Sequence, residues 1–387
     1  MIHSDTLYGV SMWSGVSARP YIDFALLNDL HTKSTYINYP LNQTGNYGGN
    51  EIVGLTAYNK KVFGSSALTT DFIYDPNNPD WIYNNLPSGL AQADELFPYN
   101  NTLFGGYYNK PELVVSFLDT NRTCINRVAI DSFLVSIKDS IGNQHRIRSF
   151  AGYTYGGYHY IFFSTCAYED DQTGTTFLFK YVMETGNIYL IGKMDSPGID
   201  NLEVVPGAGS TVYIYGVSSN VFVKTYDVTS DSNNPGYFIS QKGTRGAALV
   251  YHSPYLYVMC TDTIMGWHQS FIRKYTALPI NNDMFDSNFT CERISKNYCD
   301  GGKMVFGNDG YIYAFWRTSE ITGHANCVFK IDPNNLSSFS VIAGSDTTAI
   351  PDDDNIILQI GIDKGDLQNL DLYLGGYRGV FRAYKSY

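Results

Sequence analysis

Glutamate is scarce in this sequence, and so is charge in general. Only 8 of the 37 acidic residues are Glu, and charged residues make up 16% of the 387 positions, against about a quarter in an ordinary soluble domain. Glu favours helix interiors, whereas Asp favours caps and turns. The composition therefore excludes a coiled coil, a helical bundle and a charge-rich disordered chain.

Long hydrophobic runs and basic clusters are missing as well. The longest apolar stretches, such as Ile356–Leu358, are far shorter than a membrane span, so we expect no transmembrane segment. The formal net charge is −11, and no Lys/Arg cluster stands out beyond Lys60–Lys61. This argues against binding to nucleic acid or to an anionic membrane. Residues 1–8 are polar and show no signal peptide; a cytosolic protein, a mature chain with an added Met and a virion protein released without secretion all fit.

No local motif of enzyme or metal chemistry is present. The sequence has no P-loop, dinucleotide fingerprint or Gly-x-Ser-x-Gly, and its six Cys form no zinc-spaced set. Cys291 and Cys299 are near enough in sequence for a local disulfide; six buried thiols are the other interpretation. Acidic clusters such as Asp352–Asp354 lack EF-hand spacing and fit solvated loop charge. We expect no cofactor, and a metal site stays open.

Aromatic residues and glycine are abundant instead, with 33 Tyr, 22 Phe and 36 Gly. Short aromatic-rich runs recur between Gly/Asn/Asp/Pro turns, which is typical of strands, and no long window has a helical apolar period. The clearest repeat predicts strands at 311–316, 328–332 and 339–342, with a polar turn between the last two. Similar copies start at 159, 212, 256 and 372, and the one at 212 predicts further strands at 221–227 and 237–239. Weaker copies start near Leu7, Val62 and Leu103.

The copies start about 42 to 60 residues apart, and such a period with four short strands per unit fits β-propeller blades. We therefore predict an all-β fold, a single β-propeller over residues 1–387. Seven blades fit the copies best, and eight are the alternative. The first copy lacks an innermost strand and the last an outermost one, so we expect both termini to complete one blade and close the ring. Residues 132–148 fit no copy and are expected to form an extra hairpin.

The repeats resemble β-propellers in general, over nearly the whole chain. Two of them are similar to kelch repeats: Leu103–Tyr107 followed by Val115–Asp119, and Leu374–Tyr377 followed by Phe381–Tyr384, each with a Gly pair. The Trp-Asp signature of WD repeats and the Asp box of sialidases are absent. The Tyr/Asn/Thr-rich, charge-poor composition resembles that of surface and virion proteins of thermophilic archaea.

Tryptophan is concentrated in one set of predicted loops. In a propeller blade, the loops between the second and third strands project from the same face as the connections between blades. These loops are predicted at 13–20, 167–175, 261–270 and 316–326. Three of the four Trp fall in or beside them, and Trp is enriched in binding hot spots. The turns at the opposite end, such as 75–78 and 332–335, fit plain turns. The predicted ligand-binding residues are Trp13, Arg19, Trp267, His268, Trp316, Arg317 and His324. The competing interpretation is that these Trp pack between blades.

Three functions follow from these observations. The first is a non-enzymatic binding or structural propeller on an exterior surface, extracellular or on a virion, such as an adhesin or an assembly protein. Its partner would be a protein or glycan, or neighbouring subunits of an assembly, bound through the aromatic loop face. The alternative is a propeller enzyme that acts on glycans or peptides at an axial site. An intracellular scaffold is the third.

Overall fold

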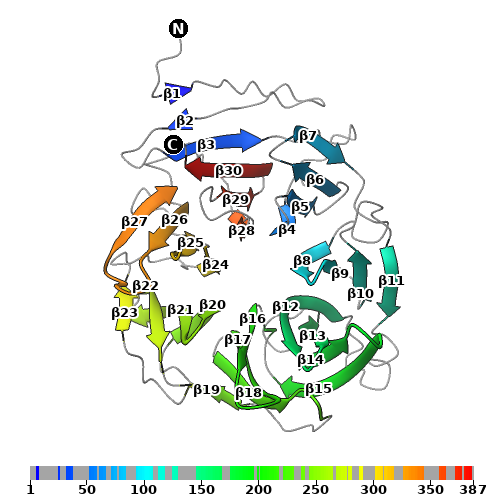
Figure 1. Ribbon diagram of the computed structural model, residues 1–387. Helices are drawn as coiled ribbons and strands as arrows, with labels where there is room; N and C mark the ends of the chain where they lie inside the picture. Colours follow the sequence, from blue (N-terminus) through cyan, green and yellow to red (C-terminus); the bar gives the residue numbers. More distant parts are fainter. Residues whose placement is uncertain are drawn as a thin grey trace. The chain divides into compact units, whose positions relative to one another are not determined.

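The computed structural model of the chain contains only β-strands and turns in its described part (Figure 1). That part has no helix, and hence none with the length and apolarity to span a membrane. The described residues are 6–7, 25–26, 32–37, 52–58, 61–66, 71–75, 78–83, 93–107, 112–117, 124–129, 145–167, 175–195, 198–199, 201–217, 221–230, 237–239, 244–264, 267–276, 278–280, 287–290, 301–307, 309–317, 326–343, 357–362, 371–376 and 379–385. Side chains are described for 54–56, 61–65, 95–106, 113, 146–166, 176–193, 198–199, 201–217, 221–230, 248–260, 272–276, 278–280, 303–307, 309–314 and 329–339.

The described strands form seven sheets of four antiparallel strands and one two-stranded sheet. Each four-stranded sheet is named after its lowest-numbered strand. The exception is the sheet that contains β28, β29, β30 and β3, which is named the β28 sheet. The β4 sheet contains β4 (Ile52–Tyr58), β5 (Lys61–Ser66), β6 (Asp71–Asp75) and β7 (Asn78–Tyr83). The β8 sheet contains β8 (Ala93–Tyr99), β9 (Thr102–Tyr107), β10 (Glu112–Phe117) and β11 (Cys124–Ala129). The β12 sheet contains β12 (His145–Tyr155), β13 (Tyr158–Ala167), β14 (Thr175–Val182) and β15 (Asn187–Asp195).

The remaining sheets repeat this pattern. The β16 sheet contains β16 (Asn201–Pro206), β17 (Thr211–Val217), β18 (Val221–Asp227) and β19 (Tyr237–Ile239). The β20 sheet contains β20 (Thr244–His252), β21 (Tyr255–Ile264), β22 (Trp267–Tyr275) and β23 (Ser287–Thr290). The β24 sheet contains β24 (Gly301–Phe306), β25 (Ile312–Arg317), β26 (Asn326–Ile331) and β27 (Phe339–Ala343). The β28 sheet contains β28 (Ile357–Ile362), β29 (Asp371–Gly376), β30 (Gly379–Lys385) and β3 (Thr32–Ile37). The two-stranded sheet pairs β1 (Thr6–Leu7) with β2 (Ala25–Leu26).

The two ends of the chain meet in one sheet. Strand β3 pairs with β30 in antiparallel register, with Thr32 opposite Lys385 and Ile37 opposite Val380. The sequence predicts that both termini complete one blade, and this pairing joins segments from both ends of the chain in one four-stranded sheet. The strand that does so is Thr32–Ile37, because the segment near Leu7 pairs with β2 instead.

Contacts divide the chain into two compact units. The first unit comprises residues 1–96, 264–269 and 291–387, and the second comprises 97–263 and 270–290. Within the first unit, β24 lies beside β28, and β28 lies beside β4. Lys303 on β24 also donates to both carboxylate oxygens of Glu95, at 3.1 and 3.4 Å.

The sheets of the second unit pack face to face in chain order. Buried aromatic and aliphatic side chains fill the space between the β8 and β12 sheets, then between the β12 and β16 sheets, and then between the β16 and β20 sheets. Phe163 and Phe179, for example, are fully buried and stack with ring centroids 5.1 Å apart. Each large side chain buried in this way contributes about 1.5–3 kcal/mol. The alternating aromatic pattern of the strands therefore supplies one buried face to each neighbouring sheet.

The strands predicted from the repeats are present, with three changes of position. The predicted strands 221–227 and 237–239 have the same bounds as β18 and β19, and no helix occurs in the described residues. Strand β22 begins at Trp267 and β25 extends to Arg317, so the loops predicted at 261–270 and from 316 onward are partly strand. Trp and His at these positions continue the ladder, with Trp316 opposite Cys327. Residues 145–148 begin β12, whereas 132–144 of the predicted extra hairpin lie outside the described residues.

Candidate functional site

The hairpin of β12 and β13 has a tight tip. Gly156 and Gly157 form its two-residue turn, with φ of 60° and 82°, and Tyr155 pairs with Tyr158 across it. A two-residue hairpin turn with both central residues at positive φ is readily formed by Gly-Gly. The two strands have 11 and 10 residues, so this tip is held by a long ladder. We call residues 153–160 the tyrosine hairpin.

Four tyrosines share one face of this hairpin. Tyr153 is opposite Tyr160, and Tyr155 is opposite Tyr158, and directly opposed residues of an antiparallel pair project to the same side. The rings of Tyr153 and Tyr155 stack with centroids 6.5 Å apart and an angle of 10° between their planes. Tyr160 is buried, Tyr153 and Tyr155 are half-buried, and Tyr158 is 47% exposed. We call these four side chains the tyrosine face.

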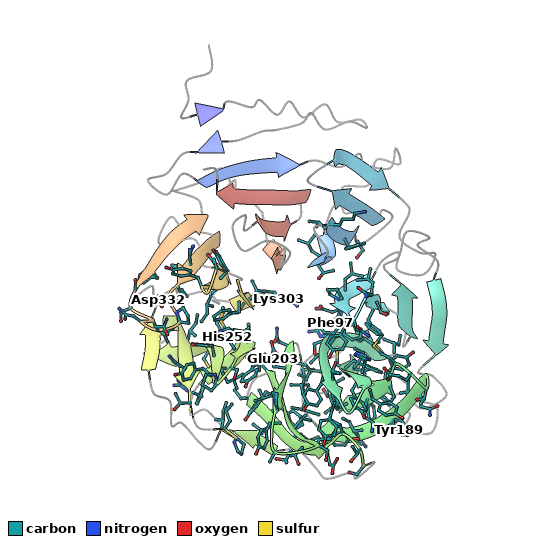
Figure 2. All side chains as sticks on the ribbon, in the orientation of Figure 1. Phe97, Tyr189, Glu203, His252, Lys303 and Asp332 are labelled. Carbon is teal, nitrogen blue, oxygen red and sulfur yellow. The ribbon has the colours of Figure 1, made fainter. Side chains whose placement is uncertain are left out.

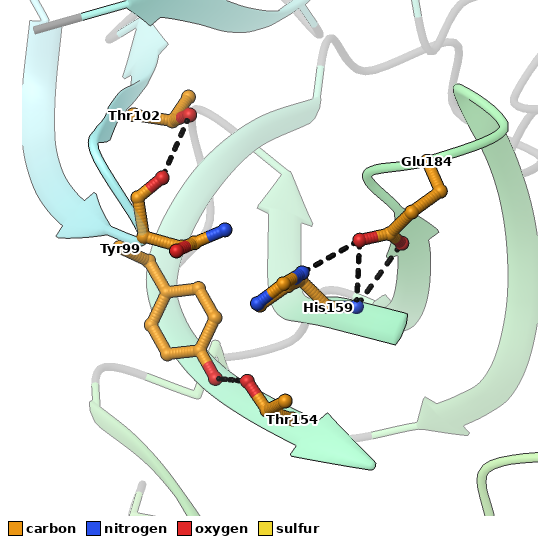
Figure 3. Close-up of polar contacts among 6 residues, drawn as sticks. Tyr99, Thr102, Thr154, His159 and Glu184 are labelled. Carbon is orange, nitrogen blue, oxygen red and sulfur yellow. Dashed lines mark hydrogen bonds and ion pairs between the residues drawn. The ribbon is translucent and has the colours of Figure 1, made fainter. Parts of the chain in front are cut away.

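The other side of the same hairpin is tied to the β8 sheet. The Tyr99 hydroxyl lies 2.7 Å from Oγ1 of Thr154, and the Tyr99 ring meets the His159 ring edge-on at 6.3 Å (Figure 3). A Cβ atom added to Gly152 would lie 2.2 Å from this Tyr99 ring. Glycine at 152 thus lets the Tyr99 ring pack directly on the backbone of β12, which fixes the hairpin from this side.

Glu184, in the turn between β14 and β15, holds the base of the hairpin. Its carboxylate accepts the backbone N–H of His159 at 3.1 and 3.0 Å, and Oε1 lies 2.6 Å from His159 Nδ1 (Figure 3). Partial burial raises the pKa of Glu184, but the hydrogen bonds from His159 outweigh it and hold the pKa below its ordinary value. A His–carboxylate pair is one part of a hydrolytic triad. Within the described residues no hydroxyl or thiol is hydrogen-bonded to His159, and the bonds to Glu184 tie the turn between β14 and β15 to the start of β13.

A buried lysine lies behind the tyrosine face, between the β12 and β16 sheets. Lys180 is 3% exposed. Its Nζ is 4.7 Å from the ring centroid of Tyr189 (labelled in Figure 2), 5.4 Å from that of Tyr226 and 5.9 Å from that of Tyr160. It also donates to the Val228 carbonyl oxygen at 3.3 Å. These rings and the carbonyl take the place of water around the ammonium group.

The same pairing of tyrosine and lysine recurs in two other sheets, with one difference. Lys274 lies 3.9 Å from the ring centroid of Tyr255, at the start of β21, and Lys330 lies 4.1 Å from that of Tyr311, just before β25. Tyr158 holds the corresponding place at the start of β13. Among the described side chains, no Lys or Arg lies over the Tyr158 ring, because Val182 is opposite Tyr160, where the β24 sheet has Lys330 opposite Tyr313. The outer ring of the tyrosine face is therefore open.

Two carboxylates give this end of the sheets a negative charge. Asp227, at the end of β18, accepts from Thr229 Oγ1 at 2.7 Å and from the Thr229 backbone at 2.9 Å. These hydrogen bonds lower the pKa of Asp227. Burial raises the pKa of Tyr160, and the charges of Glu184 and Asp227 raise it further. Both carboxylates therefore act on the tyrosine face, while the ammonium groups of Lys180 and Lys224 are buried.

The predicted ligand-binding residues are not brought together in the described part of the chain. Trp13, Arg19 and His324 lie outside the described residues. Trp267 and His268 begin β22, and Trp316 and Arg317 end β25; only their backbone is described. The prediction that these four lie in loops is wrong, because they extend the strand ladders. Their role in ligand binding stays a prediction.

The tyrosine hairpin was missed by sequence reasoning that sorted loops by tryptophan. The signal was present as Tyr155-Gly156-Gly157-Tyr158, two glycines between aromatic strand residues, which is a hairpin pattern. The inter-sheet neighbours of Lys180 carry no such local signal, because Tyr226 comes from another sheet. Among the described residues, no group of three or more His, Cys, Asp or Glu side chains is placed to hold a metal ion. Cys166 and Cys260 are buried.

Comparisons with known proteins identify a fold but no family. No protein-family model matches the chain, and no curated protein matches it. A solved chain of the mitotic checkpoint complex is similar, at 11% identity over 88% of this chain and 88% of its own, with a TM-score of 0.51. U3-55K is similar at 5% identity over 87% of this chain and 95% of its own, with a TM-score of 0.53. Sqt1 of Saccharomyces cerevisiae is 11% identical over 88% and 97%, with a TM-score of 0.48.

These neighbours are WD40 β-propellers. At such low identity the similarity of the first two shows the fold alone. The chain is an all-β protein with a β-propeller fold, as its repeats predict, and it has this fold without the Trp-Asp signature.

Proposed function

We propose that this protein is a protein-binding β-propeller and that the tyrosine hairpin is its principal contact site. The observation that carries the proposal is the tyrosine face, which places four Tyr side chains on one side of a short, tightly turned hairpin with Tyr158 47% exposed. Tyr offers a large apolar surface together with a hydroxyl, and it is enriched in the hot spots of protein interfaces.

Rigidity supports this assignment. The hairpin is fixed on one side by Tyr99 packed on Gly152, and at its base by Glu184 bonded to His159. A preorganised aromatic surface loses little conformational entropy when a partner binds. One structural neighbour comes from an assembly of proteins, the mitotic checkpoint complex, which is consistent with a fold used for protein contacts.

The proposal includes the predicted architecture. We infer that the seven four-stranded sheets are seven blades, and that the β28 sheet closes the ring by joining both chain ends. Two observations support this inference: the pairing of β3 with β30 and the packing of successive sheets in each unit. The exterior or virion location, and a glycan as ligand, stay predictions from composition.

Site-specific photocrosslinking tests the contact site. A benzophenone amino acid is placed at position 158 and, as the matched control, at position 208, the exposed tip of the neighbouring β16–β17 hairpin. Both variants are irradiated in an extract of cells that contain the protein, and any crosslinked protein is then purified and its Kd measured. We expect a partner at position 158 that is absent at 208.

The affinity of that partner decides the proposal. Tyr158→Ala should weaken it by about 2 kcal/mol, or about 30-fold, as for a hot-spot residue, whereas Ala208→Ser should leave it unchanged. Circular dichroism confirms that both variants fold. Equal crosslinking at the two positions, or a Tyr158→Ala variant that binds every crosslinked protein as tightly as the unmodified chain, contradicts the proposal.

A further inference from the structure

Tyr158 differs from its counterparts in one contact. Tyr255 and Tyr311 hold the same place in their sheets, and each has a lysine ammonium of its own chain within about 4 Å of the ring centroid, at 3.9 and 4.1 Å. In the β12 sheet Val182 is opposite Tyr160, at the place where the β24 sheet has Lys330 opposite Tyr313. Lys180 lies two residues before Val182, and the Tyr189 ring is nearest to it at 4.7 Å. The ring of Tyr158 is also the more exposed, at 47% against 37% for Tyr311.

We propose that the protein partner supplies this cation: a Lys or Arg side chain of the partner lies on the Tyr158 ring, beside Tyr155. This inference rests on the proposed function and names the chemistry of the partner, a basic segment. The face of a Tyr ring attracts an ammonium or guanidinium group, and this chain uses that attraction repeatedly within its own sheets.

The charges around the tyrosine face favour a basic partner. Glu184 and Asp227 lie at this end of the β12 and β16 sheets, and both act on the neighbouring Tyr160. Among the described side chains, the cations nearby are Lys180 and Lys224, which are 3% and 0% exposed, and the partly exposed His159 bonded to Glu184. The accessible charge is thus negative, in keeping with the net charge of −11 for the chain. An acidic partner would be repelled by these two carboxylates.

Peptide display identifies the preferred chemistry without knowledge of the natural partner. A library of random twelve-residue peptides is selected on the full chain after depletion on the Tyr155→Ala/Tyr158→Ala variant, so that the surviving peptides require the tyrosine face. We expect these peptides to be enriched in Lys or Arg. For the best peptide, replacing its basic residue by norleucine should weaken binding by about 3- to 30-fold, which is the range of a cation–π contact.

Substitutions at Tyr158 separate a cation contact from a simple apolar one. Trp attracts cations at least as well as Tyr, so Tyr158→Trp should keep the affinity of the selected peptide. Tyr158→Leu keeps apolar bulk but loses the ring, and it should weaken binding by about 3- to 30-fold. Tyr311→Leu is the matched control, because Lys330 already lies over that ring; it should have no effect.

The outcomes distinguish the two proposals. Peptides that require the tyrosine face but carry no basic residue, or that bind Tyr158→Leu as well as the unmodified chain, overturn the cation contact and leave the proposed function intact. A library from which no peptide distinguishes the full chain from the double variant overturns both.

Discussion

Two neighbouring hairpins have similar backbones but different side chains at their tips. The β12–β13 and β16–β17 hairpins belong to adjacent sheets that share a buried interface. The first ends in the tyrosine face on strands of 11 and 10 residues, whereas the second has strands of 6 and 7 residues joined by Gly207–Ser210. The second tip is closed by its own backbone, with the Gly207 N–H bonded to the Thr211 carbonyl at 2.8 Å.

The comparison shows that the strands of a sheet provide the buried core, whereas the hairpin tip provides a surface. The strands of both sheets contribute to the same buried core, so their apolar pattern is constrained by packing. The turns of both tips use Gly at positive φ, with Gly157 at φ 82° and Gly209 at φ 65°. Aromatic side chains at one tip and small ones at the other are therefore a difference in surface chemistry on a common framework.

The largest effect on stability is expected at Lys180, which joins the two sheets. Lys180→Ala removes the ammonium from three Tyr rings and leaves a cavity, so we expect the free energy of unfolding to fall by about 2–4 kcal/mol. Urea denaturation measures this change. Lys193→Ala, at an exposed position of the same sheet, is the control and should change stability by less than about 0.5 kcal/mol. Equal effects would mean that Lys180 does not link the sheets.

A methyl group at Gly152 should loosen the tyrosine hairpin from the β8 sheet. The added Cβ would lie 2.2 Å from the Tyr99 ring, so Gly152→Ala must displace that ring, and overpacking of this kind costs about 1–3 kcal/mol. Gly192→Ala is the matched control, because its Cβ would make an ordinary 3.6 Å contact with Leu178. Thermal unfolding of both variants measures the difference, and a Gly152→Ala variant as stable as Gly192→Ala contradicts the packing described for Tyr99.

Lys224 gives the stability of the β16 sheet a pH dependence. Burial lowers the pKa of Lys224 from 10.5 to about 8. Below pH 8 this lysine is protonated in the folded and unfolded states, and its buried charge destabilises the fold fully; the penalty declines as the pH rises from 8 to 10.5. We therefore expect Lys224→Met to be at least as stable as the unmodified chain at pH 7.5, with the difference shrinking by pH 10. Urea denaturation at both values measures it, and a difference that grows with pH would contradict the burial of this charge.

The smallest effect is expected at Glu184. Because hydrogen bonds from His159 hold its folded-state pKa below the ordinary value of 4.5, this contribution to stability is present above about pH 4.5 and is lost as the pH falls through the folded-state pKa. The carboxylate is partly exposed, so Glu184→Gln should cost about 0.5 kcal/mol at pH 7, and less near pH 3. A cost that is unchanged at pH 3 would show that the charge of Glu184 is not what stabilises the hairpin.

The sequence predicts the strands well because each one is a local pattern. The run Val221–Asp227 has its predicted bounds since alternating apolar residues end at a turn rich in Asp and Ser. Loop lengths were predicted less well: Trp267 and Trp316 were assigned to loops although they continue ladders, because a pairing partner such as Cys327 lies on another strand. The tyrosine face depends both on a local sequence pattern and on contacts between sheets. Its turn is visible as Gly156-Gly157, but the inward position of Lys180 is decided by Tyr226 and Val228 of the next sheet.

Hydrogen exchange of the complex tests the central claim most directly. The full chain is mixed with the partner crosslinked at position 158, and amide exchange is compared with that of the chain alone. We expect slower exchange over residues 153–160 and no change over 206–211, the tip of the neighbouring hairpin. Slower exchange in the segments around Trp267 and Trp316, with residues 153–160 unchanged, would contradict the assignment of the tyrosine hairpin as the contact site.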